Sequence, residues 1–397
     1  MSIYQYNFPT RIQFGAGAVK LLGPALQEAG KKRPLIVTDR GLLPLAPVTE
    51  TQARLAGEGL EPAVFGGVWG NPVKSQVLAG VEAFRSHRAD SIVGLGGGAA
   101  LDVAKAILLL VHHPGDLFDY EDEKPGALPI DREIPYWVSV PTTAGTGSEV
   151  GRSTVISDDA THVKKIIFSP RLLAARVFLD PELTLGLPPA VTAATGMDAL
   201  THLVEAYLAK GFQPLCDGIA LAGVRLVAEG LPVAVDLAER IEKGQKALVT
   251  SAAHLEARGK MLNAATMGGV AFQKGLGVTH SLAHALSTVC DLHHGLANGI
   301  AIPYAMAFNA SVAGDRLADL ARMVGAKDAS AEGFIVWLKE LRARLGIPDT
   351  LRAVGVREEH LERLVAIAVA DGCHPNNPRP VTQADFQSLF RQALGAA

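Results

Sequence analysis

The order of apolar segments constrains the fold of this chain more than any other feature of its sequence. Over the first half, short apolar segments such as PLIVTD, residues 34–39, and SIVGLGGG, residues 91–98, alternate with segments of helical periodicity. Strands and helices that alternate in this way are typical of a parallel sheet covered by helices. After DPELTLGLPP, residues 180–189, the strand patterns end and only helical patterns follow.

We therefore predict two domains, an α/β domain over residues 1–185 and an all-α domain over residues 186–397. A chain of 397 residues is also longer than one hydrophobic core usually supports. The first strand is expected over residues 4–14. The helices expected in the second domain span residues 190–209, 216–230, 245–272, 280–290, 297–311, 331–345, 357–370 and 383–394. A strand at the N-terminus has an edge to which a second copy can pair, so we expect a homodimer or a higher homo-oligomer.

The charge balance argues against nucleic acid and membranes as partners. The formal net charge is −3 and no cluster of Lys and Arg stands out. Purely apolar segments, such as about residues 106–111, are much shorter than the ~20 residues of a membrane-spanning helix. The N-terminal sequence has no signal-peptide pattern, and Cys216, Cys290 and Cys373 are scattered, as in a reducing compartment. We therefore expect a cytoplasmic protein.

Two loops that follow predicted strands carry residues suited to binding a dinucleotide. Gly96, Gly97 and Gly98 precede a helix, where the backbone can approach a pyrophosphate and the helix N-terminus offers free N–H groups. The second loop, TTAGTGSEV at residues 142–150, combines glycines with hydroxyl side chains that can bind phosphates and the nicotinamide arm. Either loop alone is compatible with an ordinary turn. Two such loops at successive strand ends favour a nucleotide site.

Asp39 ends the first buried strand, where an acid can accept hydrogen bonds from the adenosine ribose. A carboxylate there repels an added 2′-phosphate, which favours NAD over NADP. The neighbouring Arg40 leaves the alternative open, because a cation at this place can receive that phosphate.

Histidines are concentrated in one predicted helix and the turn after it. The segment GVTHSLAHALSTVCDLHHG, residues 277–295, holds His280, His284, His293 and His294. A single histidine is more often a hydrogen-bonded core or surface residue than a ligand, but a cluster changes that expectation.

Asp198 and His202 lie four residues apart in a second helical segment, so their side chains share one face. Together with the clustered histidines they offer a carboxylate and several imidazoles. This set of oxygen and nitrogen donors suits a divalent cation such as zinc or iron(II).

The segments GGGAALDVAK, PTTAGTGSEV, GMDALTHLVEAY and GLGVTHSLAHAL, followed by HHG, resemble the iron-containing, or group III, alcohol dehydrogenases. The resemblance covers nearly the whole chain in the same order. It implies a Rossmann-like N-terminal domain and a helical C-terminal domain in a dehydroquinate-synthase-like architecture. It also implies a site between them that binds NAD(P) and one divalent metal, Fe²⁺ or Zn²⁺.

The resemblance also assigns roles to individual residues. The implied metal ligands are Asp198, His202, His280 and His294, and His284 matches a histidine near the nicotinamide that relays a proton. The implied cofactor contacts are Asp39, Asn71, Gly97, Gly98, Asp102, Thr142, Thr143, Thr146 and Lys164. Two positions depart from the family pattern: Ala99 stands where a serine is usual, and Gly151 where many members have threonine.

Three further segments, GSEVGR, FQKGLG and CHPNNPR, are most similar to the 4-hydroxybutyrate dehydrogenase branch. They contain Arg152 and Lys274, which we predict to contact an anionic group of the substrate, although each is also compatible with a solvated surface charge. The predicted activity is metal-dependent hydride transfer between NAD and a short-chain alcohol with an anionic far end. The alternatives are a general short-chain primary alcohol or diol dehydrogenase, a metal-dependent lyase of the dehydroquinate synthase type, and a metal- or nucleotide-binding module without activity.

Overall fold

The computed structural model describes residues 8, 10–122 and 124–395, which form two compact units. The α/β unit contains the described residues of 8–143 and 147–184, and the helical unit contains residues 144–146 and the chain from residue 185 onwards. The predicted combination of an α/β domain and an all-α domain is confirmed. The sequence pattern gave no sign that the short loop 144–146 groups with the helical unit.

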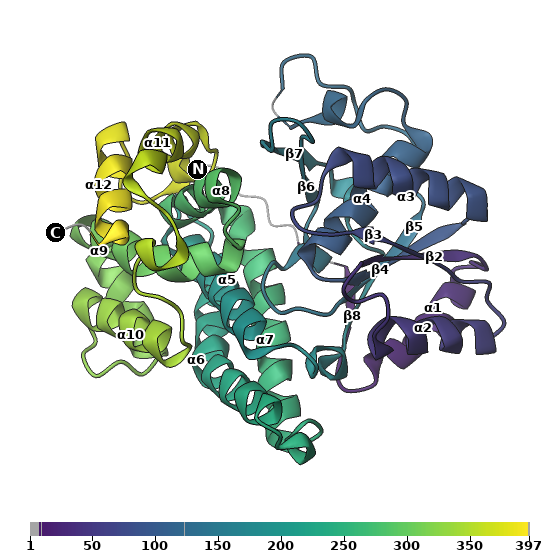
Figure 1. Cartoon of the computed structure of the whole chain (residues 1–397), viewed down its shortest axis with the longest axis horizontal. Helices are drawn as coiled ribbons and strands as arrows, with labels where there is room; N and C mark the ends of the chain where they lie inside the picture. The colour runs from purple at the N-terminus through teal and green to yellow at the C-terminus, as the bar shows by residue number, and fades with distance from the viewer. Residues whose placement is uncertain (1–7, 9, 123, 396–397) are drawn as a thin grey trace. The chain divides into compact units, whose positions relative to one another are not determined.

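A six-stranded parallel sheet forms the centre of the α/β unit (Figure 1). In spatial order its strands are β1 (Arg11–Phe14), β8 (Arg176–Leu179), β5 (Tyr136–Pro141), β4 (Ser91–Gly96), β2 (Pro34–Asp39) and β3 (Ala63–Val68). Every residue of the central strand β4 is buried. Burial on both faces is expected for a parallel strand that is covered by helices on each side.

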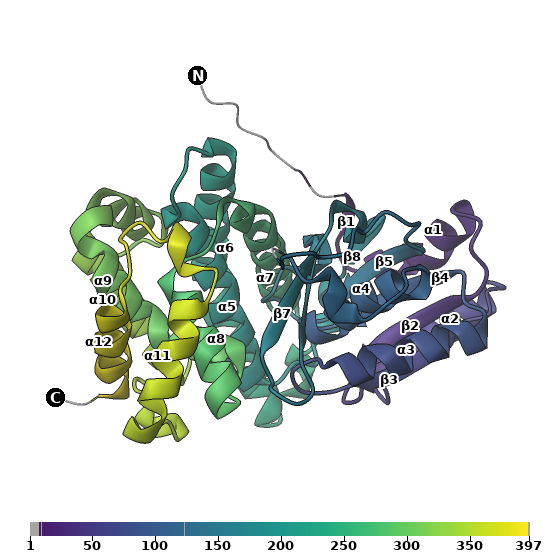
Figure 2. The same ribbon diagram turned by 90° about the horizontal axis from the view of Figure 1, so that it is seen from above.

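Helices cover both faces of this sheet. Figure 1 shows α1 (Leu22–Glu28) and α2 (Ala46–Gly57) on one face and α3 (Lys74–His87) and α4 (Gly98–His112) on the other. The first pair packs on strand side chains that include Ile36, Val93 and Val138. On the opposite face α3 and α4 lie side by side (Figure 2).

The register of the strands brings three strand ends to one edge of the sheet. Gly96 at the end of β4 pairs with Pro141 at the end of β5, and the Thr142 N–H donates to the Gly96 carbonyl at 3.0 Å. Val37 of β2 pairs with Gly94, so β2 ends at Asp39 level with Gly96. Ligands of open parallel sheets bind at the carboxyl ends of their strands.

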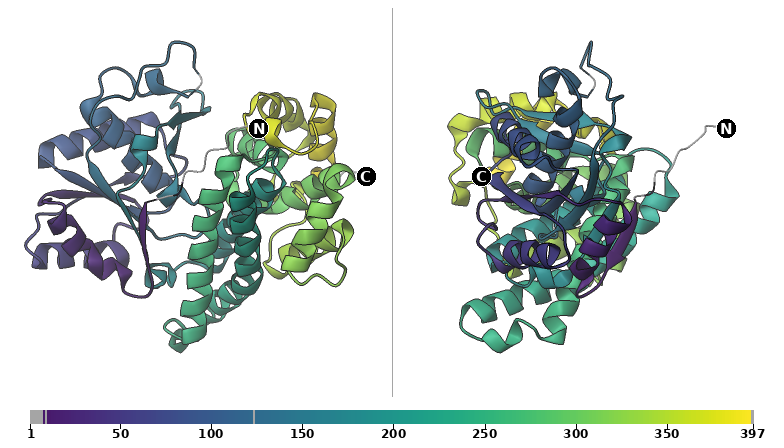
Figure 3. Two further views of the ribbon diagram at one scale, coloured as in Figure 1. Left: turned by 180° about the vertical axis from the view of Figure 1, so that it is seen from behind. Right: turned by 90° about the vertical axis from the view of Figure 1, so that its right-hand side faces the viewer.

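The helical unit is built from eight longer helices. These are α5 (Pro189–Leu208), α6 (Pro214–Glu242), α7 (Ala252–Ala271), α8 (Val278–Cys290), α9 (His294–Met323), α10 (Ala331–Arg344), α11 (Leu361–Ala370) and α12 (Gln383–Leu394). Helices α5, α6 and α7 pack against one another, and Figure 3 shows α6 and α7 running alongside each other. A capping box starts α12, with Thr382 and Asp385 bonded reciprocally; the spacing of these two residues in the sequence already indicates it.

Two helices extend beyond their predicted limits. The helix predicted over residues 216–230 continues as α6 to Glu242, because buried side chains on both sides of Pro232, such as Leu231 and Val235, keep it packed in the core. By length and composition α6 is apolar enough to cross a membrane, a property it shares with many core helices. The helix predicted over residues 297–311 is part of α9, which continues past a kink at Ala313, where φ is −121°.

The predicted N-terminal strand is described only in part. Arg11–Phe14 form β1, which pairs with β8 alone within the described chain. Of the other residues predicted for this strand, 8 and 10 are not in it, and 4–7 and 9 lie outside the described residues. The free edge of β1 is where a second chain can pair. The homo-oligomer therefore stays a prediction that rests on this edge.

We expect light scattering to give the mass of a dimer or a larger homo-oligomer at micromolar concentration. Phe14→Lys should shift this mass towards the monomer, because Phe14 is 53% exposed on the edge strand and a charge there opposes pairing. Leu78→Lys is the matched control, since Leu78 is 51% exposed on α3, away from that edge. A monomeric unmodified protein would contradict the prediction.

Candidate functional site

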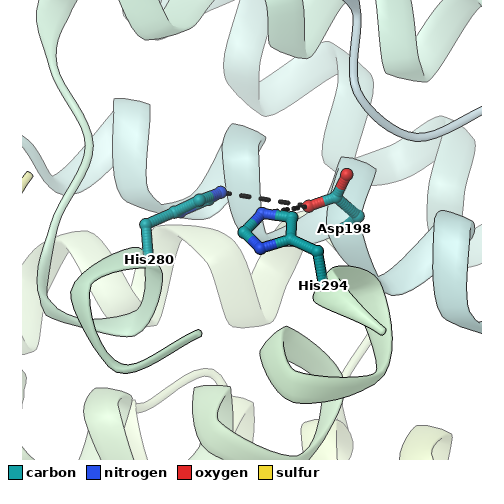
Figure 4. A group of neighbouring side chains, drawn as sticks. All are labelled: Asp198, His280 and His294. Carbon is teal, nitrogen blue, oxygen red and sulfur yellow. Dashed lines mark ion pairs between the residues drawn. The ribbon is translucent and has the colours of Figure 1, made fainter. Parts of the chain in front are cut away.

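Three side chains of the helical unit converge on one point. Asp198 lies on α5, His280 on α8, and His294 is the first residue of α9. One ligand atom of each lies within 4.8 Å of the others (Figure 4). The Asp198 Oδ1 atom is 3.4 Å from His294 Nε2 and 3.9 Å from His280 Nε2. We call these three residues the metal cluster, because their donor atoms suit a divalent ion.

The local sequence explains why His294 reaches α5. Asp291 has a left-handed backbone conformation, φ 49°, which ends α8 and allows α9 to start after a short turn. The next residue after His294 is Gly295, and a Cβ atom there would collide with the Ala194 carbonyl of α5. A glycine at this position therefore lets the N-terminus of α9 approach α5 closely.

Glu205 holds His280 from behind. Its Oε2 atom lies 2.7 Å from His280 Nδ1, and its carboxylate also accepts the Gly277 N–H at 2.8 Å and the Thr279 N–H at 2.6 Å. Since a carboxylate accepts hydrogen bonds, Nδ1 of His280 carries the proton and Nε2 keeps the lone pair that a metal requires. Glu205 was not predicted as a site residue, although residues 198, 202 and 205 follow the spacing of one helix face.

His202 lies beside the metal cluster rather than inside it. Its ring stacks on that of His280 with 4.6 Å between centroids, and its Nδ1–H donates to the Gly145 carbonyl at 3.3 Å. The same nitrogen is 4.0 Å from Asp198 Oδ1. Burial lowers the pKa of His202 to about 4, so the ring is neutral at neutral pH, as a ligand must be.

The surroundings of the metal cluster fit a cation. His280 Nε2 is buried and has no hydrogen-bond partner among the described residues. Burial by itself lowers the pKa of His280, but the hydrogen bond and charge of Glu205, together with Asp198, outweigh it and raise the pKa. The site is therefore negative enough to favour a positive charge. Asn298, which was not predicted as a site residue either, donates to Asp198 Oδ1 at 2.8 Å and holds that carboxylate in place.

A pocket of about 300 Å³ lies at the carboxyl edge of the parallel sheet in the α/β unit. It is lined by Asp39, Gly41, Val68, Trp69, Gly70, Gly97, Ala99 and Ala100. Asp39 is held by the Leu42 N–H, which donates to its Oδ1 at 2.8 Å. The Arg40 guanidinium lies over the Trp69 ring, 4.2 Å from its centroid. The pocket thus places the predicted ribose acceptor and the glycine loop together.

The glycine loop is closely packed on the second predicted loop. Gly97 precedes α4 in an extended conformation, and a Cβ atom there would lie 3.3 Å from the Thr143 side chain. Gly98 is the first residue of α4. Gly97, Gly98, Thr142 and Thr143 are therefore neighbours in the α/β unit, and their contact with the phosphates of a cofactor stays a prediction.

Asp102 is engaged within the protein. Its two carboxylate oxygens accept the Ser148 hydroxyl at 2.6 Å and the Val155 N–H at 3.0 Å. The fully buried Lys105 donates to the same Ser148 hydroxyl at 2.7 Å, and burial lowers its pKa. This network ties the loop after β5 and the hairpin of β6 (Ser153–Ser157) and β7 (Lys164–Phe168) to α4. Asp102 thus shapes the loop that is predicted to hold the cofactor.

The remaining predicted cofactor residues are not among those that line the pocket at the strand ends. Asn71 follows β3 in a turn, and Lys164 is the first residue of β7. Thr146 belongs to the loop that groups with the helical unit.

The two cations predicted to bind substrate differ sharply. Lys274 is buried, and its ammonium group forms an ion pair with Asp217 at 2.5 Å and donates to the Tyr207 carbonyl at 3.1 Å. Its charge is therefore balanced by Asp217 inside the helical unit. Lys274 fits neither the predicted substrate contact nor the alternative of a solvated surface charge. Arg152 lies in the α/β unit with its guanidinium 5.2 Å from the centroid of the Phe168 ring. Arg152 is the remaining candidate for a contact with an anionic group of the substrate.

The chain matches two family models over most of its length. Residues 9–181 match the model described as iron-containing alcohol dehydrogenase, and residues 192–394 match its C-terminal counterpart. A 4-hydroxybutyrate dehydrogenase of Cupriavidus necator is 38% identical over 97% of this chain and 98% of its own length. An NAD-dependent methanol dehydrogenase of Bacillus methanolicus is 36% identical over 98% of this chain and 99% of its own. A solved 1,3-propanediol oxidoreductase superposes with a TM-score of 0.90 at 37% identity, covering 99% of this chain and 100% of that chain.

The metal cluster yields a direct test of metal binding. After loading with Fe²⁺ or Zn²⁺, elemental analysis should find about one metal ion per unmodified chain and none in His280→Ala. Glu205→Gln should retain the site but bind the metal roughly ten- to a hundredfold more weakly, because the residue behind His280 no longer fixes its orientation with a charge. His360→Ala, the same substitution elsewhere in the helical unit, is the control and should bind normally. Stoichiometric metal in His280→Ala would contradict the ligand assignment.

Proposed function

The chain belongs to the iron-containing alcohol dehydrogenase family, and we propose that it transfers hydride reversibly between NAD and a short-chain alcohol that carries an anionic group at its far end. The observation that carries the dehydrogenase chemistry is the convergence of Asp198, His280 and His294, with Glu205 behind them. The family match favours a dehydrogenase over the lyase and over the inactive binding module that the sequence left open.

The proposed roles follow from the donor atoms and their positions. When bound, the divalent metal supplies a Lewis acid for the alcohol oxygen and NAD supplies the hydride acceptor. Asp198, His280 and His294 would hold the metal together with His202, whose ring lies against His280. His284, one helical turn after His280, would accept the proton of the substrate hydroxyl.

The α/β unit would bind the NAD. Its pocket at the strand ends joins Asp39 with Gly97, and Thr142 and Thr143 lie next to that glycine. The adenosine ribose would lie against Asp39 and the pyrophosphate against the N-terminus of α4. The proposal also includes a homo-oligomer in the cytoplasm without nucleic acid or membrane partners.

Asp39 predicts the choice between the two nicotinamide cofactors. The unmodified enzyme should prefer NAD, because Asp39 repels a 2′-phosphate and Arg40 is occupied by its stack on Trp69. Asp39→Gly should relax the preference by roughly tenfold or more, measured as the ratio of kcat/KM for the two cofactors. Arg40→Ala should change that ratio little. An unmodified enzyme that favours NADP and loses this preference in Arg40→Ala would show that Arg40 sets the choice.

Arg152 supports the anionic substrate. A guanidinium binds a carboxylate through two parallel hydrogen bonds, and the face of Phe168 orients Arg152 on the hairpin. The relative with the anionic substrate, a 4-hydroxybutyrate dehydrogenase, matches this chain at 38% identity. The methanol dehydrogenase and the 1,3-propanediol oxidoreductase match at 36% and 37%, so a general short-chain alcohol or diol dehydrogenase is the second candidate.

Substrate charge separates the two candidates. The enzyme should reduce succinate semialdehyde with a higher kcat/KM than butanal. Arg152→Met should lower the value for succinate semialdehyde about ten- to a hundredfold and leave butanal almost unchanged, since charge-assisted hydrogen bonds contribute roughly 1.5–3 kcal/mol each. Arg85→Met, on α3, is the control and should change neither value. Equal losses on both substrates would mean that Arg152 supports the fold, and a preference for neutral aldehydes would favour the second candidate.

A further inference from the structure

His284 has a partner that neither the family resemblance nor the sequence pattern assigned. Its Nδ1 atom lies 2.7 Å from Asp371 Oδ2, where Asp371 directly follows α11. The His284 ring lies 5.2 Å from that of His294 and 6.0 Å from that of His280, centroid to centroid. The pair formed by His284 and Asp371 is therefore adjacent to the metal cluster.

Asp371 is itself fixed on the side away from His284. Its Oδ1 atom accepts the Ser281 hydroxyl at 2.7 Å and the Cys373 N–H at 2.9 Å. Burial by itself raises the pKa of Asp371, but the charge that His284 carries when protonated, the hydrogen bond from His284 and these two donors outweigh it, and the pKa is lowered. Asp371 is therefore a carboxylate, which can only accept hydrogen bonds.

This contact decides which nitrogen of His284 carries the proton. Because Asp371 accepts, Nδ1 of His284 must donate, and in the neutral ring Nε2 then keeps its lone pair. The His284 side chain is 22% exposed, so a proton taken up at Nε2 can pass on to solvent.

We propose that Asp371 is a positioning residue that holds His284 in the tautomer and orientation needed to accept the substrate proton. This inference rests on the proposed dehydrogenase function. In the proposed oxidation the hydroxyl O–H bond would break as an N–H bond forms at Nε2 of His284, and NAD, when bound, would supply the hydride acceptor. Asp371 balances the positive charge on the ring until Nε2 releases the proton to solvent.

A second metal site at the same place is the competing interpretation. Donor atoms of His284, Asp371 and Cys373 lie within 4.8 Å of one another. However, the 2.7 Å separation of Nδ1 and Oδ2 is a hydrogen-bond length, and two ligands of one tetrahedral zinc ion stand roughly 3.3 Å apart. The geometry therefore favours the hydrogen-bonded pair.

The test compares Asp371→Asn with the unmodified enzyme. We expect kcat for alcohol oxidation to fall about ten- to a thousandfold, no more than acid–base groups usually contribute, while KM and metal content stay unchanged. The solvent deuterium isotope effect on kcat should rise, because proton removal becomes slower than the other steps. A purely structural role would not raise it. Asp371→Glu should recover part of the rate.

A double-mutant cycle tests whether Asp371 acts through His284. In a His284→Gln background, Asp371→Asn should cause little further loss, and fully additive losses would overturn the proposal. Should Asp371→Asn fail to fold, Ser281→Ala weakens the hold on Asp371 without touching it, and a several-fold loss with the same rise in isotope effect is expected. An unchanged rate and an unchanged isotope effect in Ser281→Ala would contradict the proposal.

Two further outcomes separate this inference from its alternatives. Cys373→Ser should keep both the activity and a single metal ion per chain, and loss of a second metal ion in this variant would establish a metal site instead. An unmodified enzyme that is metal-loaded but forms no NADH from any alcohol would refute the proposed function. An active enzyme that is indifferent to Asp371→Asn would refute only this inference.

Discussion

The helical unit depends on how the negative charges of two buried carboxylates are stabilised. Asp198 and Glu205 project from one face of α5, and each is at most 3% exposed. An unpaired buried charge is costly, so each needs hydrogen bonds or an opposite charge. Glu205 is satisfied by His280 and by N–H groups at the start of α8. Asp198 accepts a hydrogen bond from Asn298 and lies close to His280 and His294. A bound cation would balance its remaining negative charge.

The same contacts position the helices that carry the site. Glu205 accepts a hydrogen bond from the N-terminus of α8, and the N-terminus of α9 approaches α5 closely because Gly295 has no side chain. In the α/β unit the parallel register plays the corresponding part, since it brings Asp39, Gly96 and Thr142 to one edge. In both units some residues of the site lie where a helix or strand begins or ends: His294 is the first residue of α9 and Asp39 the last residue of β2.

The sequence predicted those parts of the fold and site that depend on local spacing. The alternation of strands and helices, the capping box at Thr382, and the paired Asp198 and His202 are all visible within a few residues. Glu205, Asn298 and Asp371 were missed because their contacts join residues about 75 to 100 positions apart. The buried ion pair of Lys274 was not predicted either, because Asp217 lies next to its ammonium group only once the helices have packed.

The proposed dehydrogenase function requires that the metal cluster hold one divalent ion. Anomalous X-ray diffraction from crystals loaded with Zn²⁺ or Fe²⁺ tests this most directly, because it locates the metal without reference to activity. The account predicts one strong peak per chain, roughly 2.0–2.2 Å from donor atoms of Asp198, His280 and His294, with His202 as the fourth ligand. The absence of a peak at these residues, or a single peak elsewhere in the chain, would contradict it.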